Sequence, residues 1–212
     1  MITFSAALSF AGVAFLMALS PGPNLIYLAS RSICQGRVAG FSSLAGVCLG
    51  MVMYMLATAG GLSTIFMAVP LAYDVVRMAG AAYLLWLAYR TLENGQTVTG
   101  TSVLPPESPQ KLFRTGFFTC LLNPKLVITY GALLPQFVDT SAGNVLGQTV
   151  TLGVVQIAAA AFAHSLVIIM ASTVARFLAS QGSRFVVFQR YVLSTVFASL
   201  AVRLAFDSRS SA

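Results

Sequence analysis

The chain has 212 residues, of which 58% are hydrophobic and only 8% are charged, and its mean hydropathy is +0.86. A soluble protein of this size needs far more charged side chains to cover its surface, so the composition excludes a soluble enzyme. The net charge of +7 does not indicate nucleic-acid binding, because the basic residues are scattered singly rather than gathered on one stripe.

Long stretches without a charged side chain predict helices that cross a membrane. Residues 2–30, 38–73 and 140–175 carry no Asp, Glu, Lys or Arg, and each stretch exceeds the roughly 20 apolar residues that cross a hydrocarbon core. A signal peptide is the alternative for the first stretch, but no Lys or Arg precedes its apolar run, so we expect a retained helix. In chain order, the predicted spans cover about residues 4–28, 39–62, 70–91, 113–137, 147–173 and 186–206.

Lysine and arginine residues set the predicted orientation of these helices. Basic loops are enriched on the cytoplasmic side of membrane proteins, so we expect both termini on the outer side. The predicted cytoplasmic loops hold Arg31, Arg37, Arg90, Lys111, Arg114, Arg176, Arg184 and Arg190, whereas the outer side holds Arg77, Arg203 and Arg209.

The chain divides into two halves of three predicted spans each. Residues 93–111, rich in Gly, Thr, Ser and Pro, form the expected cytoplasmic linker between residues 1–92 and residues 112–212. Because three is an odd number, the second half must insert upside down, and a weak likeness between residues 19–22 and 122–125 agrees with such a repeat. The predicted fold is an all-α integral membrane protein, with about six transmembrane helices in two three-helix inverted repeats.

The sequence Ser20-Pro21-Gly22-Pro23-Asn24 interrupts the first predicted span. Neither proline has an N–H to donate, so the break leaves backbone groups that lipid cannot satisfy. The helix that restarts near Asn24 would present its N–H groups to a cavity, where they suit an anionic group such as a carboxylate. A plain proline kink is the alternative.

A second break, Asn123-Pro124-Lys125, falls in the fourth predicted span. Counted from Arg114, Lys125 lies roughly 16 Å into the membrane. A lysine at that depth is unfavourable by at least about 2.5 kcal/mol unless it is paired or hydrated, which marks it as a functional candidate. The alternative, in which Lys125 snorkels to the surface, leaves only residues 126–138 to cross the core, too few for a straight helix.

Other polar residues in the predicted spans are candidates for proton coupling or substrate contact. His164, the only histidine, lies deep in the fifth span and could titrate in a proton-coupled cycle, with a neutral hydrogen-bonded histidine as the alternative. Asp74 is a second candidate for proton coupling. Polar contacts within the bundle could come from Tyr54, Tyr83, Tyr130 and Gln156, of which we take Tyr83 and Tyr130 as substrate contacts.

The motifs of an ATP-driven pump and of a metal site are missing from the sequence. There is no Gly-rich phosphate loop ending in Lys and Ser or Thr, and no cluster of Cys, His and carboxylates at ligand spacing. Cys34, Cys48 and Cys120 form no CxxC pair. We therefore expect no cofactor, no metal and no enzymatic activity.

In these features the chain resembles the LysE/RhtB family of bacterial amino acid exporters. The likeness covers nearly the whole chain and is carried by Ser20–Asn24, Gly46–Gly50, Gly80–Leu87, Leu122–Lys125 and Pro135–Phe137. It implies a secondary transporter in the bacterial inner membrane that exports an amino acid or derivative and is driven by the proton motive force. The chain departs from the family pattern at Met51 and at Ala163-His164-Ser165, where polar or acidic residues are common.

The resemblance also implies a substrate site where the two helix breaks meet. The helix end near Asn24 and Lys125 would hold the carboxylate of the substrate, while backbone carbonyls, tyrosines or Asn24 take its ammonium, and one half would rock against the other. The implied partners are the amino acid, protons and membrane lipid, and small-residue motifs permit a homodimer.

Two alternatives from other classes remain at this point. A membrane-embedded redox carrier or enzyme would require paired cysteines, which the chain lacks. An accessory membrane subunit without transport of its own predicts that Lys125→Ala leaves any transport phenotype intact.

Overall fold

The computed structural model describes residues 2–61 and 107–179, together with 75, 78–83, 85–86, 89, 195, 198–199 and 202. In this part of the chain the regular structure is helical throughout and contains no strand. The helices are α1 (Phe4–Leu19), α2 (Pro23–Ala59), α5 (Pro109–Leu121), α6 (Pro124–Ile128), the π-helical turn η1 (Thr129–Leu133), the 3-10 turn η2 (Leu134–Phe137) and α7 (Val145–Ala179).

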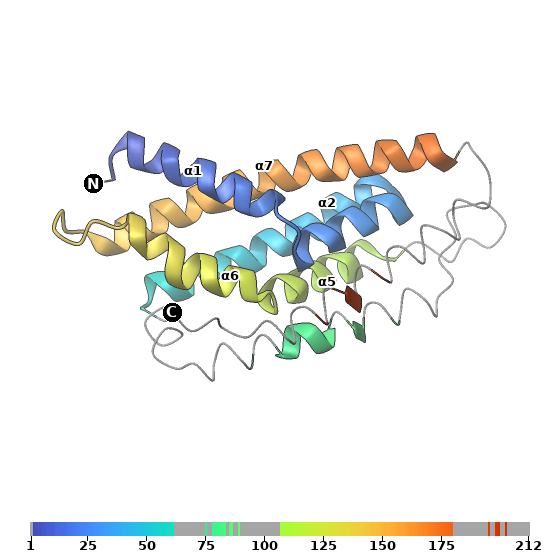
Figure 1. Ribbon diagram of the computed structural model, residues 1–212, viewed down its shortest axis with the longest axis horizontal. Helices are drawn as coiled ribbons and strands as arrows, with labels where there is room; N and C mark the ends of the chain where they lie inside the picture. The colour runs from blue at the N-terminus through green and yellow to red at the C-terminus, as the bar shows by residue number, and fades with distance from the viewer. Residues whose placement is uncertain are drawn as a thin grey trace.

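These helices lie side by side in one bundle (Figure 1). α2 packs against α5 on one side and α7 on the other, and α1 packs against α7. By length and hydropathy α2 and α7 could each cross a membrane, and the pair Pro109–Leu121 and Pro124–Phe137, bent by 53°, could form a third span. These features confirm the predicted all-α fold with helices apolar enough to cross a membrane. The arrangement as two inverted repeats stays a prediction.

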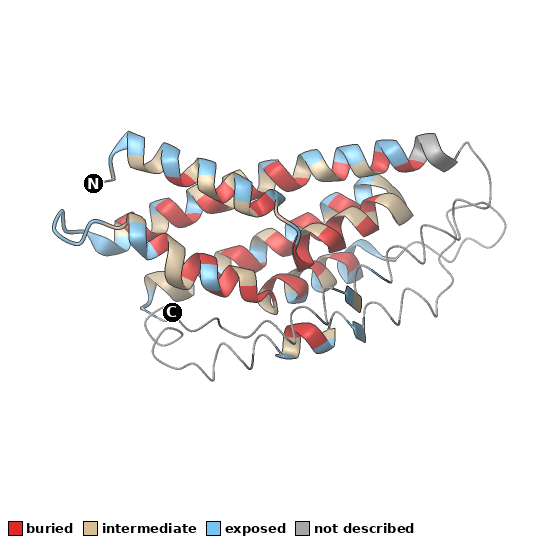
Figure 2. Cartoon of the chain, viewed as in Figure 1, coloured by how far each residue is buried: buried red, intermediate tan, exposed pale blue. Residues whose placement is uncertain are grey.

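The outer surface of the bundle is apolar. Phe4 and Leu8 of α1 and Phe162 and Met170 of α7 are each more than 60% exposed. Figure 2 shows exposed residues along the outer edges of α1 and α7 and buried residues on the sides that face the bundle. Side chains of this kind are stable in contact with lipid tails, so the bilayer is the solvent that the surface fits.

α2 consists of two helical limbs that meet at Gly36. This glycine has φ 83° and ψ 179°, a region of backbone conformation that essentially only glycine adopts. Ser43 Oγ donates to Tyr27 Oη at 3.2 Å, although 16 residues of straight helix would separate the two by about 24 Å. The chain therefore doubles back at Gly36, so that residues 23–35 complete the first span and residues 37–59 form the second.

The observed helices follow the predicted spans in order, with different ends. The first span continues past the predicted end at residue 28, and the linker predicted for residues 93–111 overlaps the start of α5. α5 begins early because Ser108 caps it: Ser108 Oγ accepts the N–H of Lys111 at 3.3 Å, and Pro109 takes the first helical position. The spans predicted for 70–91 and 186–206 lie largely outside the described residues.

Glycines allow the second limb of α2 to cross α5 with the two backbones in contact. A Cβ at Gly46 would overlap the Phe113 carbonyl, and a Cβ at Gly116 would overlap the Ser43 carbonyl. One turn beyond Gly46, a Cβ at Gly50 would lie 2.7 Å from the Cβ of Cys120. These contacts explain the small residues of the second predicted span as packing residues.

Candidate functional site

The two helix breaks predicted from the sequence face each other inside the bundle. Lys125, in the first turn of α6, points its ammonium at the last turn of α1. Nζ donates to the carbonyl oxygen of Met17, to the carbonyl oxygen of Ser20 at 2.9 Å and to Ser20 Oγ at 2.5 Å. These three acceptors occupy all three donors of the ammonium group.

The first break leaves the end of α1 without the usual continuation of the helix. Ser20 and Gly22 are extended, and α2 restarts with Pro23 in its first turn and without a side-chain cap. The carbonyls at the end of α1, of which that of Met17 also accepts the Ser20 hydroxyl at 3.1 Å, carry partial negative charge, and the N–H groups at the start of α2 carry partial positive charge. Gly22 gives Lys125 room, because a Cβ there would lie 3.4 Å from Lys125 Cδ.

The second break is closed by local hydrogen bonds. Asn123 Oδ1 accepts the backbone N–H of Lys125 at 3.1 Å, and Pro124 occupies the first helical position of α6. Thr129 Oγ1 donates to the Lys125 carbonyl at 2.8 Å. The cap and the proline thus fix the backbone of Lys125 at the bend, from which its side chain reaches α1.

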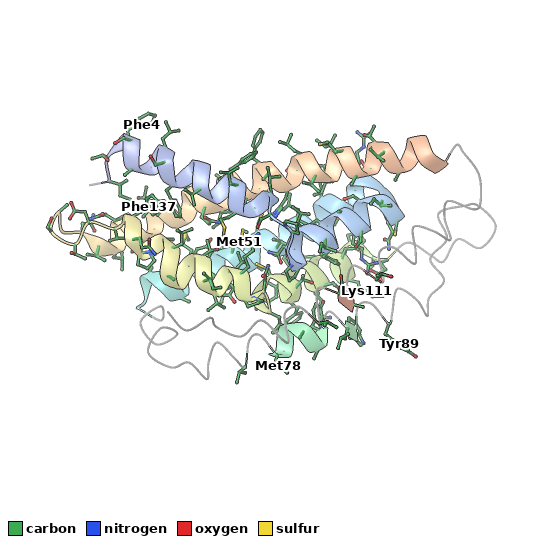
Figure 3. The ribbon with its side chains drawn as sticks, viewed as in Figure 1. Phe4, Met51, Met78, Tyr89, Lys111 and Phe137 are labelled. Atoms are coloured by element: carbon green, nitrogen blue, oxygen red, sulfur yellow. The ribbon has the colours of Figure 1, made fainter. Side chains whose placement is uncertain are left out.

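A cavity of about 20 Å³ lies between the two breaks. This volume suits about one water molecule and is too small for an amino acid. Met51 of α2, near the middle of the bundle in Figure 3, borders the cavity. The lining comprises Met17, Ala18, Ser20, Gly22, Asn24, Leu25, Met51, Asn123, Lys125, Leu126, Thr129, Gln156, Ala160 and His164.

Three of the side chains that line the cavity have a buried polar atom without a hydrogen-bond partner. These atoms are Asn24 Oδ1, Gln156 Oε1 and His164 Nδ1, and their side chains belong to residues that are 2–4% exposed. An unmet buried polar group is unfavourable by about 1–3 kcal/mol, so the cavity suits a polar occupant.

The formal charge that borders the cavity in the described part of the chain is positive. Among the described residues that line it, Lys125 carries the only formal charge, and no Asp or Glu is present. The described part of the chain also holds no group of His, Cys, Asp and Glu that could bind a metal ion.

A second polar group, the ion cluster (Arg31, Glu107 and Lys111), joins the end of the first span to the start of α5. Arg31 Nη1 lies 3.1 Å from Glu107 Oε2, although the two groups are not oriented as a hydrogen bond, and Lys111 Nζ lies 2.8 Å from Glu107 Oε1. The guanidinium of Arg31 lies 5.6 Å from the ring centre of Tyr27, whose hydroxyl donates to the Leu112 carbonyl at 3.1 Å. We expect these contacts to hold this end of the bundle closed.

Of the predicted site residues, six line the cavity: Ser20, Gly22, Asn24, Asn123, Lys125 and His164. The other described ones do not. Pro21, Pro23 and Pro124 shape the breaks without bordering the cavity. Tyr83 lies against α5, with its hydroxyl 3.4 Å from the Thr115 carbonyl, and Tyr130 is stacked on Tyr54 at 5.7 Å. Asp74 lies outside the described residues.

Sequence reasoning gave Gln156 too little weight. It borders the cavity together with Ala160 and His164, which follow it at intervals of four residues on α7. Residues four apart share one face of a helix. Gln156 lies eight positions before His164 in an uncharged span, so the spacing alone could have placed it on the same face as His164. Met51 and His164, where the chain departs from the LysE/RhtB pattern, both border the cavity.

Comparison with known proteins agrees with these features. The model of the family described as LysE type translocator matches residues 10–208. A homoserine/homoserine lactone efflux protein of Salmonella typhimurium is 32% identical over 142 residues, which is 67% of this chain and 68% of that protein. A leucine efflux protein of Klebsiella pneumoniae is 32% identical over 132 residues, 62% of each chain. No solved structure matches the chain significantly.

Proposed function

Because the chain belongs to the LysE type translocator family, and is therefore a transporter rather than an enzyme, we propose that it exports amino acids or their derivatives from the cytoplasm. The observation that carries the proposal is the meeting of two helix breaks around one half-buried lysine. Discontinuous helices that meet inside a bundle bind substrate in other secondary transporters, where helix ends supply the charge.

The two ends of the broken first span suit the two charges of an amino acid. Asn24 and Leu25 border the cavity at the start of α2, where the first N–H groups of a helix lack an intrahelical partner and favour the carboxylate. The carbonyls at the end of α1 and Asn24 Oδ1 favour the ammonium. In our proposal the cavity widens when one half of the inverted repeat rocks against the other.

We propose a cargo with an uncharged side chain. Lysine or arginine would bring a second positive charge beside Lys125, and no carboxylate lines the cavity in the described part of the chain to offset it. The two relatives are named for amino acids or derivatives of this class, homoserine and its lactone in one and leucine in the other. Homoserine, its lactone and leucine all carry the α-ammonium, whereas the lactone has no free carboxylate. The ammonium is therefore the charged group common to all three.

For the driving force we propose the proton gradient, with His164 as the carrier. Its unpaired Nδ1 borders the same cavity as Lys125, so protonation of one group is unfavourable while the other is charged. Replacement by glutamine keeps a polar side chain but removes the titrating group. His164→Gln should retain downhill efflux and lose its acceleration by a proton gradient, and an unchanged acceleration would transfer the role to another residue, with Asp74 next.

The remaining expectations stay part of the proposal. They are insertion in the bacterial inner membrane with both termini outside, contact with lipid along the apolar faces, and assembly as a homodimer. Protease or thiol accessibility of tagged termini in spheroplasts tests the orientation, and the mass of the protein in detergent or nanodiscs tests the dimer.

The test of export uses proteoliposomes loaded with labelled homoserine or leucine, with and without a proton gradient. Wild type should release label faster than empty vesicles, and Lys125→Ala should abolish the release. Arg114→Ala, which removes an exposed basic residue of α5 outside the cavity, is the matched control and should retain it. An accessory subunit would show no release with any amino acid, and loss of release in both variants would remove the special role of Lys125.

A further inference from the structure

The end of α1 already holds a primary ammonium ion, supplied by the protein itself. Lys125 Nζ donates to two backbone carbonyls, of Met17 and Ser20, and to the hydroxyl of Ser20. The backbone groups are fixed by the helix end and not by Lys125, because Ser20 N–H bonds back to the Leu16 carbonyl at 3.0 Å. The site is therefore built for one R–NH3+ group with three N–H donors.

We propose that this α1 carbonyl site is the ammonium subsite of the carrier, and that Lys125 occupies it only until the ammonium of the cargo takes its place. The inference rests on the proposed export of amino acids. In this proposal the ammonium of Lys125 fills the subsite when no cargo is bound, in addition to any contact of Lys125 with the carboxylate of the cargo.

Volume is the first reason for an exchange. The cavity of about 20 Å³ holds about one water, so no amino acid fits while the Lys125 side chain fills the space in front of α1. Withdrawal of the four-carbon stem of Lys125 would enlarge the cavity where the carbonyls lie. Lysine suits this role because its side chain has many rotamers and its ammonium binds as a point charge.

The second reason is that a displaced ammonium has other partners within the same cavity. Asn24 Oδ1 and Gln156 Oε1 are acceptors without a hydrogen bond, and they border the cavity from α2 and α7. A zwitterionic cargo adds its own carboxylate as a further partner. The exchange replaces one ammonium by another at the two half-buried carbonyls, so neither loses its ammonium partner.

The exchange makes a prediction about the cargo. Recognition depends on the N–H donors of a cationic amine, so the parent amino acid should compete well. Its N-acetyl derivative has no positive charge at nitrogen, and its N,N,N-trimethyl derivative has the charge but no N–H. Neither derivative should displace Lys125.

The direct test uses Lys125→Met, which keeps an apolar stem of similar length and leaves the carbonyl site empty. Methylammonium chloride is the probe, and tetramethylammonium chloride at equal ionic strength is its control. Methylammonium should raise the unfolding midpoint of the purified Lys125→Met protein in nanodiscs by about 2 °C or more. It should not raise that of wild type or of Lys111→Met. Ser20→Ala added to Lys125→Met should reduce the shift.

Equal shifts in wild type and Lys125→Met, or equal effects of the two ions, would overturn the proposal. A measurement on wild type covers the case in which Lys125→Met does not fold: inhibition of labelled amino acid efflux by the three forms of the amine. At least tenfold weaker inhibition by the acetyl and trimethyl forms supports the exchange, and equal inhibition overturns it. A methylammonium shift without amino acid efflux would support the ammonium site and contradict the proposed function.

Discussion

Replacing Gly46 by alanine should loosen the contact between α2 and α5. An added Cβ would overlap the carbonyl oxygen of Phe113 and would lie 2.8 Å from the carbonyl carbon and 2.9 Å from the N of Phe117. These neighbours are backbone atoms of another helix, so no side chain can rotate away, and relief requires the two helices to separate.

The expected loss of stability follows from two opposing effects. Overpacking of this kind destabilises by about 3 kcal/mol at the upper end of its usual range, whereas glycine to alanine in a helix stabilises by up to about 1 kcal/mol. The net loss of about 2 kcal/mol corresponds to a midpoint about 4–8 °C lower for a chain of this size.

The assay is thermal unfolding in detergent, followed with a thiol-reactive fluorophore. Cys120 is fully buried and reports the opening of the bundle. Gly12→Ala is the matched control, because a Cβ at Gly12 of α1 meets nothing within 4 Å. A midpoint for Gly46→Ala within about 2 °C of the Gly12→Ala value would refute the close crossing of α2 and α5.

Three further predictions concern the cavity, the ion cluster and the loop before α7. Gln156→Leu removes an unpaired acceptor from the cavity and should shift the efflux preference from homoserine toward leucine by about tenfold; Val154→Leu, on the exposed side of α7, should not. Glu107→Gln leaves the basic partners of the ion cluster without a carboxylate, so the closed end should open more often and Cys34 should react several-fold faster with a water-soluble maleimide. An unchanged rate would argue against the cluster as a closure. The pKa of Asp139 is lowered by the hydroxyl of the serine two residues later, then by two backbone N–H groups. Its stabilising effect is therefore present at neutral pH and lost as pH falls through the lowered pKa, so Asp139→Asn should unfold at a lower temperature than wild type at pH 7 and match it in acid. A constant difference at all pH values would contradict this.

The sequence was sufficient to locate both breaks because proline and glycine act on the backbone directly. Two prolines around Gly22, and Pro124 after Asn123, prevent a continuous helix wherever the chain folds. The depth of Lys125 in the membrane, counted along a helix, stays a prediction. The family resemblance carried further, to an exporter, and the match over residues 10–208 confirms the family.

The partner of Lys125 could not be predicted in the same way. We expected a substrate carboxylate, whereas the structure gives it the carbonyls at the end of α1. Every residue has a carbonyl, so the sequence does not show which carbonyls will bind a lysine. Only the fold brings Lys125 to the carbonyls of α1, which lie about a hundred positions earlier in the chain. The sharp reversal at Gly36 was missed for a related reason, because a single glycine within a helical pattern does not reveal its φ angle.

The repeat stays a prediction, and the structure suggests a different register for it. The sequence comparison paired Pro21 with Pro124. In the structure the restarted helices begin at Pro23 and Pro124, each with its proline in the first turn. Matching these starts shifts the alignment by two residues and places Asn24 opposite Lys125, so the polar residues at equivalent positions of the two breaks both border the cavity.

The break after α1 also separates this helix mechanically from the one that follows it. Side chains from the other half of the chain contact α1. The rings of Phe10 and Phe137 lie 4.9 Å apart between centres, and those of Phe15 and Phe162 lie 6.1 Å apart. Lys125 donates hydrogen bonds to the last turn of α1 and to Ser20. The residues between the two helices are extended and have no helical hydrogen bonds to the helix that follows. In the rocking motion that we propose, α1 would therefore move with α6 and α7, and the extended residues 20–22 would take up the bending between α1 and α2.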